Sequence, residues 1–73
     1  MKTLQFNHNI EGSVSVMVED EKVGIITDKN GKVSATVRYE GETYNMRYKS
    51  LEEARLDIRA FFVELDVYDN RIS

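Results

Sequence analysis

The sequence predicts a two-layer α+β domain, in which an antiparallel β-meander of four to five strands carries one C-terminal helix packed across one face. Three observations lead to this prediction. Several runs of residues alternate between apolar and polar side chains, as half-buried strands do. Short turns rich in glycine, asparagine and acidic residues separate these runs, so consecutive strands must pair antiparallel. The last third of the chain instead repeats its apolar residues with the spacing of a helix.

Five segments carry the strand pattern, and the Asn30-Gly31 pair is a strong hairpin signal because both residues tolerate positive φ. The predicted strands are residues 1–6, 10–19, 23–27, 32–40 and 43–49. Alternation within the third strand places Val23 and Ile25 toward the core and Ile26 toward solvent.

The helix is predicted to run from Ser50 to Tyr68. Ser50 and Glu53 have the spacing of a capping box, and no glycine or proline interrupts the segment from Leu51 onward. One face carries an apolar stripe that would pack on the sheet, made of Leu51, Ala54, Ile58, Phe61, Phe62, Leu65 and Tyr68. The remaining residues, 69–73, form a polar tail.

The predicted core combines the inward residues of the strands with the helix stripe. Its members are Val14, Val16, Val18, Val23, Ile25, Val33, Val37, Tyr39, Tyr44, Met46, Leu51, Ala54, Ile58, Phe61, Phe62 and Leu65.

A second stripe lies nearly opposite the first on the same helix and has no sheet to pack against. A helix lying on a single sheet ordinarily has a polar outer face, so this stripe is the candidate interaction surface. The apolar residues of the stripe are Leu56, Ala60, Val63 and Val67, and Arg59 at its rim completes the candidate surface. Two interpretations remain open: scattered exposed apolar residues, which are common, or a true contact surface. A two-fold homodimer would let the stripe meet its own copy, and a larger protein could cover it equally well.

Seventy-three residues predict a single domain over residues 1–73, too short for a deep substrate cavity beside a full core. The absence of cysteine excludes disulfides and thiolate metal sites, and a single histidine disfavours a zinc site. The sequence shows no nucleophile–base arrangement and no glycine-rich phosphate loop. We therefore predict no catalytic, metal-binding or cofactor-binding residues and expect a non-enzymatic protein.

A net charge of −3 disfavours a dominant electrostatic grip on nucleic acid. No apolar run approaches the length of a membrane span and no signal-peptide pattern opens the chain, so we expect no membrane partner and a cytoplasmic location. Small acidic regulators, among them inhibitors encoded by phages and other mobile elements, act by covering a surface of a larger protein. The favoured function is therefore a small protein-interaction or regulatory, inhibitor-like domain that acts by surface binding as a homodimer.

An alternative interpretation uses the outer face of the sheet. Gly31-Lys32 opens a strand, Gly41 lies in the following turn, and Ser50-Leu51-Glu52-Glu53-Ala54 opens the helix. Residues 31–62 thereby resemble AP2-type and integrase arm-type DNA-binding domains, in which three strands precede one helix. The resemblance implies a sheet laid along the major groove by arginine and tryptophan. This chain departs from that pattern, because Val33 stands where an aromatic residue is usual and tryptophan is absent.

The alternative function is accordingly nucleic-acid binding by the outer sheet face. The candidate residues on that face are Met17, Ile26, Thr36, Arg38, Asn45 and Arg47.

Overall fold

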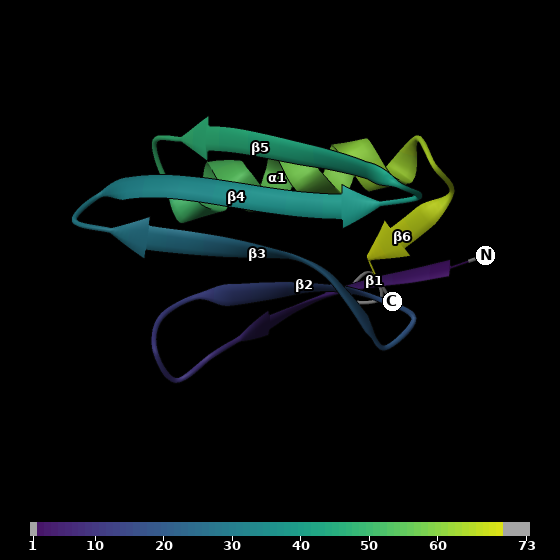
Figure 1. The fold of residues 1–73 in the computed structure, drawn as a ribbon, viewed down its shortest axis with the longest axis horizontal. Coiled ribbons are helices and arrows are strands. Elements are labelled where there is room, and N and C mark those ends of the chain that lie inside the picture. Colours follow the sequence, from purple (N-terminus) through teal and green to yellow (C-terminus); the bar gives the residue numbers. More distant parts are fainter. Residues whose placement is uncertain (1, 70–73) are drawn as a thin grey trace.

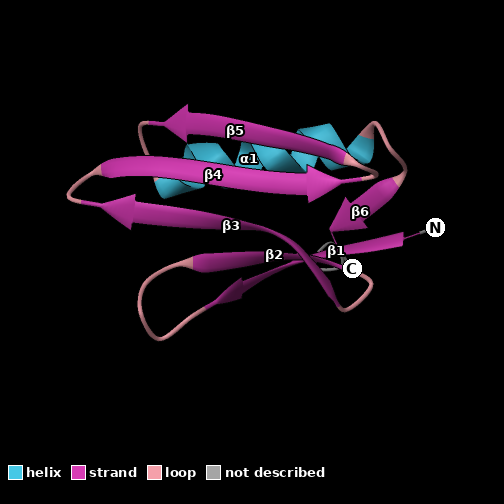
Figure 2. Ribbon diagram, in the orientation of Figure 1, coloured by secondary structure: helices cyan, strands magenta, loops and turns pink. Residues whose placement is uncertain are grey.

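The computed structural model describes residues 2–69, within which one helix packs on a single sheet of six strands (Figures 1 and 2). Met1 and residues 70–73, which begin the first predicted strand and make up most of the predicted tail, lie outside the described residues. The elements are β1 (Lys2–His8), β2 (Val14–Val18), β3 (Glu21–Lys29), β4 (Lys32–Tyr39), β5 (Glu42–Tyr48), α1 (Leu51–Val63) and β6 (Val67–Asp69). The predicted α+β class, with a mostly antiparallel sheet and a C-terminal helix, is confirmed.

The strands lie in the order β5-β4-β3-β2-β1-β6. Strands β1 to β5 pair antiparallel in chain order, as in the predicted meander. The sixth strand was not predicted: β6 pairs parallel with β1, which makes the sheet mixed rather than purely antiparallel. The chain therefore crosses from one edge of the sheet to the other through α1, which lies behind β4 and β5 in Figure 1.

Three two-residue turns set the register of the meander. In each turn both residues have positive φ, which is the type I′ geometry that matches the twist of paired strands. The turns are Glu19-Asp20 (φ 52° and 70°), Asn30-Gly31 (55° and 81°) and Glu40-Gly41 (52° and 82°). The hairpin predicted at Asn30-Gly31 is confirmed.

A β-bulge in β3 reverses the predicted orientation of Ile25 and Ile26. The ladder between β2 and β3 shifts by one residue between Val16 and Met17, which leaves Val23 without a partner. The bulge shifts the alternation of inward and outward side chains by one residue. Val23 before the shift and Ile26 after it therefore both point into the core and are buried. The predictions that Ile25 belongs to the core and that Ile26 faces solvent were wrong, because strict alternation cannot anticipate an inserted residue.

The helix ends at Val63 rather than at the predicted Tyr68. Asp66 adopts a left-handed φ of 62°, which aspartate tolerates better than most residues, and its N–H donates to the carbonyl of Val63 over 3.1 Å. The chain then turns into β6, where Val67 is fully buried. Val67 therefore does not lie on an outer helix stripe as predicted. Leu65 and Tyr68 are exposed, at 41% and 37%, instead of completing the inner stripe.

The core lies between the curled sheet and the inner face of α1. Ala54, Ile58 and Phe62 are its fully buried helix residues, and the rings of Phe62 and Tyr39 meet edge to face at 5.2 Å between centroids. The complete cluster is Leu4, Phe6, Val14, Val16, Val18, Val23, Ile26, Val33, Ala35, Val37, Ala54, Ile58, Phe62 and Val67. Burying each large side chain contributes roughly 1.5–3 kcal/mol to the free energy of folding.

The predicted and observed cores differ at the edges of the sheet. Tyr44 and Leu65 were predicted to be buried but are exposed. Strand β1, which showed only weak alternation in the sequence, supplies the buried residues Leu4 and Phe6.

We predict that Phe62→Ala lowers the free energy of unfolding by about 3–5 kcal/mol, because it empties a fully buried aromatic site. Phe61→Ala is the matched control, since the Phe61 ring is only partly buried, and it should cost clearly less. Urea denaturation followed by circular dichroism measures both values. Equal losses for the two variants would contradict the inner face assigned to α1.

Gly24 allows close contact between the backbones of β3 and β4. A Cβ atom on Gly24 would lie 2.6 Å from the carbonyl oxygen of Thr36 and 3.1 Å from the Cα of Val37. Gly24→Ala should therefore lower the free energy of unfolding by about 1–3 kcal/mol. Thr43→Ala, at an exposed strand position, serves as the control in the same urea titration. A Gly24→Ala midpoint equal to that of the parent would show that the two strands are farther apart.

Candidate interaction surface

An exposed apolar strip runs along the flank of α1 that faces away from the core. Leu56 and Val63 are 52% and 39% exposed, and Ala60 between them is exposed as well. We call Leu56, Ala60 and Val63 the helix strip. Of the other residues predicted for this surface, Arg59 is part-buried beside the strip, and Val67 lies in the core.

The helix strip continues onto strand β5 across an open groove. The residues that line this groove are Met46, Leu56, Asp57, Arg59, Ala60, Phe61, Val63 and Glu64. Tyr44 extends the apolar area further, because its ring is 37% exposed and meets the ring of Phe61 at 5.0 Å between centroids. We call the helix strip together with Tyr44, Met46 and Phe61 the α1/β5 surface.

Strand β5 ends the sheet and has no neighbour on its outer side within residues 2–69. The turn that precedes it closes on the pair Tyr39 and Glu42, and hydrogen-bonded pairs alternate along an antiparallel ladder. The backbone N–H and C=O groups of Thr43, Asn45 and Arg47 consequently point toward the free edge. This edge is seven residues long and contains neither proline nor a bulge, so it can accept another strand. At the opposite edge, β6 is only three residues long.

Of the residues predicted for the outer sheet face, the structure leaves some exposed there and places others in or near the core. Those exposed on the face opposite α1 are Thr36, Arg38, Asn45 and Arg47. The hydroxyl of Thr36 donates to the amide oxygen of Asn45 over 3.0 Å, so part of this face is already hydrogen-bonded within the chain. Met17 is part-buried, and Ile26 belongs to the core, so its assignment to the outer face was wrong.

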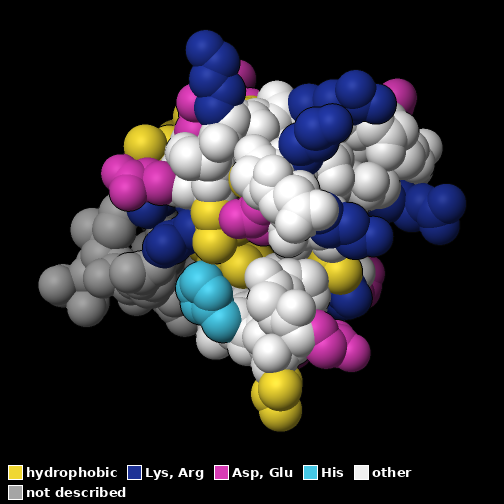
Figure 3. Space-filling model, turned by 90° about the vertical axis from the view of Figure 1, so that its left-hand side faces the viewer, with side chains coloured by type: hydrophobic (Ala, Val, Ile, Leu, Met, Phe, Trp, Pro, Cys, Tyr) yellow, Lys and Arg dark blue, Asp and Glu magenta, His cyan; other side chains and the backbone are white. Residues whose placement is uncertain are grey.

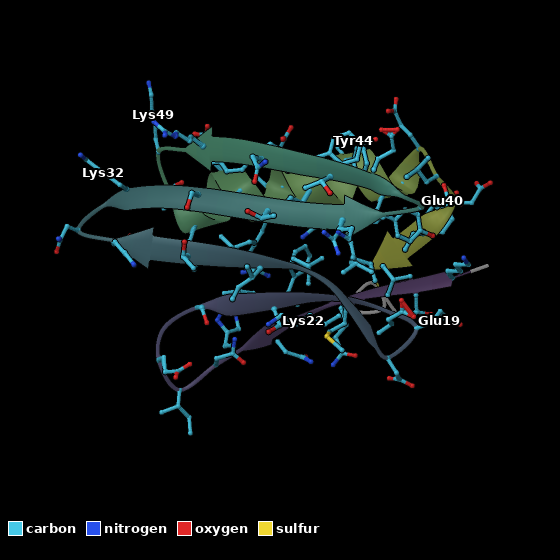
Figure 4. All side chains as sticks on the ribbon, in the orientation of Figure 1. Glu19, Lys22, Lys32, Glu40, Tyr44 and Lys49 are labelled. Carbon is cyan, nitrogen blue, oxygen red and sulfur yellow. The ribbon has the colours of Figure 1, made fainter. Side chains whose placement is uncertain are left out.

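Charged side chains gather at opposite ends of the β4–β5 hairpin. An open depression beside the β3–β4 turn is bordered by four basic residues, Lys29, Lys32, Arg47 and Lys49. Figure 4 places Lys32 and Lys49 at this end and Glu40 at the other. Figure 3 looks onto the basic end and shows lysine and arginine side chains across its upper part. Strand β5 is thus acidic where it begins, at Glu42, and basic where it ends.

Tyr48 connects the end of β5 to α1. Its hydroxyl oxygen lies 2.5 Å from Oδ2 of Asp57 and 3.0 Å from the sulfur of Met46. Burial raises the pKa of Tyr48 well above its usual value, and the hydrogen bond to Asp57 and the negative charges of Asp57 and Glu53 raise it further. This contact holds β5 against α1 at one end of the groove.

Within residues 2–69 no group of three or more histidine, cysteine, aspartate or glutamate side chains could hold a metal ion. The helix in this part of the chain lacks the length and apolar character needed to cross a membrane. Helical spacing in the sequence predicted the helix strip, but strand alternation placed Tyr44 and Met46 in the core, so the β5 half of the surface was not predicted. The signal that could have found it is the position of β5 as the last strand of the meander.

We predict that Tyr48 makes the folded protein lose stability at high pH. The folded state holds the Tyr48 proton more tightly than the unfolded chain, whose tyrosine pKa is about 10. The contribution of Tyr48 to the stability of the folded state is therefore complete below about pH 10 and is lost as the pH rises through its raised pKa. Urea denaturation is measured at increasing pH from pH 8, about two units below that reference value. The free energy of unfolding should fall more steeply with pH for the parent than for Tyr48→Phe. Asp57→Asn should fall between them, and identical slopes for parent and Tyr48→Phe would contradict the contact.

Comparison of the chain with protein-family models, curated proteins and solved structures found no match. The resemblance of residues 31–62 to AP2-type and integrase arm-type domains therefore stays a prediction. The function has to be argued from the exposed surfaces themselves.

Proposed function

We propose that the chain is a small non-enzymatic protein-interaction domain of the regulatory, inhibitor-like kind, and that it acts by surface binding. The observation that carries this proposal is the α1/β5 surface, where an exposed apolar strip lies beside an unpaired seven-residue strand edge. Exposed apolar patches rimmed by polar residues are common at protein–protein interaction sites. An unpaired edge adds a row of backbone donors and acceptors that a protein partner can satisfy.

The energetics favour a protein partner over water at this surface. Leu56 and Val63 are 52% and 39% exposed, so covering the rest of each side chain would contribute about half of the roughly 1.5–3 kcal/mol of a complete burial. The groove brings Arg59 together with the carboxylates of Asp57 and Glu64, which gives the apolar centre a charged rim. An apolar centre with a polar rim is the usual composition of a protein interface.

Nucleic-acid binding is the second candidate, and the basic end of the sheet is the observation that favours it. Lys29, Lys32, Arg47 and Lys49 border one depression, and Arg38 is exposed on the outer sheet face. Such a cluster could neutralise backbone phosphates. The net charge of −3 opposes it, because the whole molecule repels a polyanion.

Leu56→Lys tests the proposed function, with Ile10→Lys as the matched control. Both changes replace an exposed aliphatic side chain by lysine, and Ile10 lies in the β1–β2 turn, away from α1. The lysine introduced by Leu56→Lys lies one turn after Glu52, where it suits a helix. The tagged chain is used to capture protein from an extract of the cells that encode it. We expect Leu56→Lys to reduce the captured protein about tenfold, which corresponds to about 1.4 kcal/mol, while Ile10→Lys retains it.

A capture pattern that is the same for the parent and Leu56→Lys would contradict the proposed function. The nucleic-acid alternative is measured in parallel by fluorescence anisotropy with random-sequence DNA and RNA. It requires an affinity that falls steeply with salt and is reduced by the double variant Lys32→Gln, Lys49→Gln.

A further inference from the structure

We propose that the α1/β5 surface binds a second copy of this chain, whose β5 strand pairs antiparallel with the first about a two-fold axis at Asn45. The proposal rests on the proposed function and names the partner that the surface takes. It would join two six-stranded sheets into one continuous sheet with both helices on the same face. Four features of the strand and the helix support it.

The first feature is the register of the free edge. Thr43, Asn45 and Arg47 direct their backbone groups outward, and Asn45 is the middle residue of β5. An axis at Asn45 pairs all seven residues of the strand, from Glu42 to Tyr48, with those of the copy. In this register Asn45 meets Asn45 of the copy and Thr43 meets Arg47 of the copy, each as a hydrogen-bonded pair. Any other axis leaves part of the strand unpaired.

The second feature is the match between side chains on the helix side of the sheet. Tyr44 and Met46 alternate with the outward-directed residues and point to the side of α1. With the axis at Asn45, Tyr44 stands directly across from Met46 of the second copy, and the reverse contact forms by symmetry. Opposed residues that are not hydrogen-bonded lie about 4.5 Å apart between Cα atoms, so the exposed ring of Tyr44 is covered. A thioether beside an aromatic ring is a favourable contact.

The third feature is the charge along β5. Glu40 and Glu42 lie at its acidic start, whereas Arg47 and Lys49 lie at its basic end. Figure 4 shows Glu40 and Lys49 at these two ends. Antiparallel pairing brings the acidic start of each strand to the same end of the seam as the basic end of the other, with Glu42 on the α1 side of the sheet and Arg47 on the opposite side. Parallel pairing would instead bring like charges together. The charge pattern therefore selects the two-fold arrangement over a parallel one.

The fourth feature is the helix strip. The strip lines the same open groove as Met46 of β5, so pairing of the two strands places the grooves of the two copies side by side. The small side chain of Ala60 between Leu56 and Val63 allows close approach of the helices, which pack at axis separations of about 8–10 Å. Asp57 and Glu64 lie on the β5 side of α1 and Arg59 lies on the other side, so acidic residues of the two copies come nearest each other and these charges do not contribute to the pairing.

The decisive experiment is sedimentation equilibrium of the purified chain and of Asn45→Pro. The parent should sediment as a dimer. The Asn45 N–H points away from β4, and a proline is tolerated at an edge position that donates no ladder hydrogen bond. Asn45→Pro should therefore keep the far-ultraviolet circular dichroism of the parent and sediment as a monomer. A monomeric parent, or a folded Asn45→Pro that remains dimeric, overturns the proposal.

Charge reversal keeps the proposal testable if Asn45→Pro does not fold. Lys49→Glu should weaken dimerisation about tenfold, because like charges then meet at both ends of the paired strands. Adding Glu42→Lys to the same chain restores opposite charges at both ends and should recover the parental dissociation constant. A double variant that dimerises no better than Lys49→Glu overturns the antiparallel register.

Amide hydrogen exchange provides a readout without substitutions. The amides of Thr43, Asn45 and Arg47 should become more protected as the protein concentration rises, although β5 is an edge strand of the isolated chain. Fast exchange of these three amides at every protein concentration would overturn the proposal. The two proposals fail separately: a monomeric chain whose protein capture still depends on Leu56 retains the proposed function and loses only the dimer.

Discussion

The fold depends on the packing of one helix against a six-stranded sheet that is wider than a single helix can cover. Ala54, Ile58 and Phe62 fill the space beneath the curled sheet, and the absence of a large side chain at Ala54 lets the 13-residue helix lie close to the strands. Curling brings β1 and β6 around to the same core, so that Leu4 and Val67 are buried although they belong to the far side of the sheet. The same packing leaves the opposite flank of α1 uncovered. The exposed Leu56 and Val63 are therefore a consequence of building the core with a single helix.

The features of the fold that could be predicted from the sequence are those determined by neighbouring residues. The hairpin at Asn30-Gly31 follows from the tolerance of these residues for positive φ, and the start of α1 follows from Ser50, whose hydroxyl accepts from the N–H of Glu53 over 3.1 Å. The errors occur where distant residues decide the outcome. The bulge at Val23 depends on how β3 pairs with β2, and the turn at Asp66 ends a helix that no local residue interrupts.

The candidate surface shows the same division. Helical spacing alone identified Leu56, Ala60 and Val63 as residues on a face away from the sheet, and the structure leaves all three exposed. The contribution of β5 could not be found in this way, because alternation gives the same pattern for an edge strand and for a central one. Tyr44 was assigned to the core for that reason. Its exposure depends on the order of the strands, which no local pattern specifies.

The parallel pairing of β1 with β6 has a consequence for how the chain is made. Among the described elements β1 is synthesised before the others, and it can pair with β6 only after the chain has been made past Asp66. Until then, the edge of β1 from Lys2 to Leu4 stays open on the nascent chain. The hairpins that join β2, β3, β4 and β5 pair strands that are neighbours in the sequence. Pairing β1 with β6 instead joins segments that are far apart in the sequence, so it has the largest entropy cost of loop closure. This side of the sheet is therefore the part of the fold whose closure depends on the contact with the longest sequence separation between paired strands.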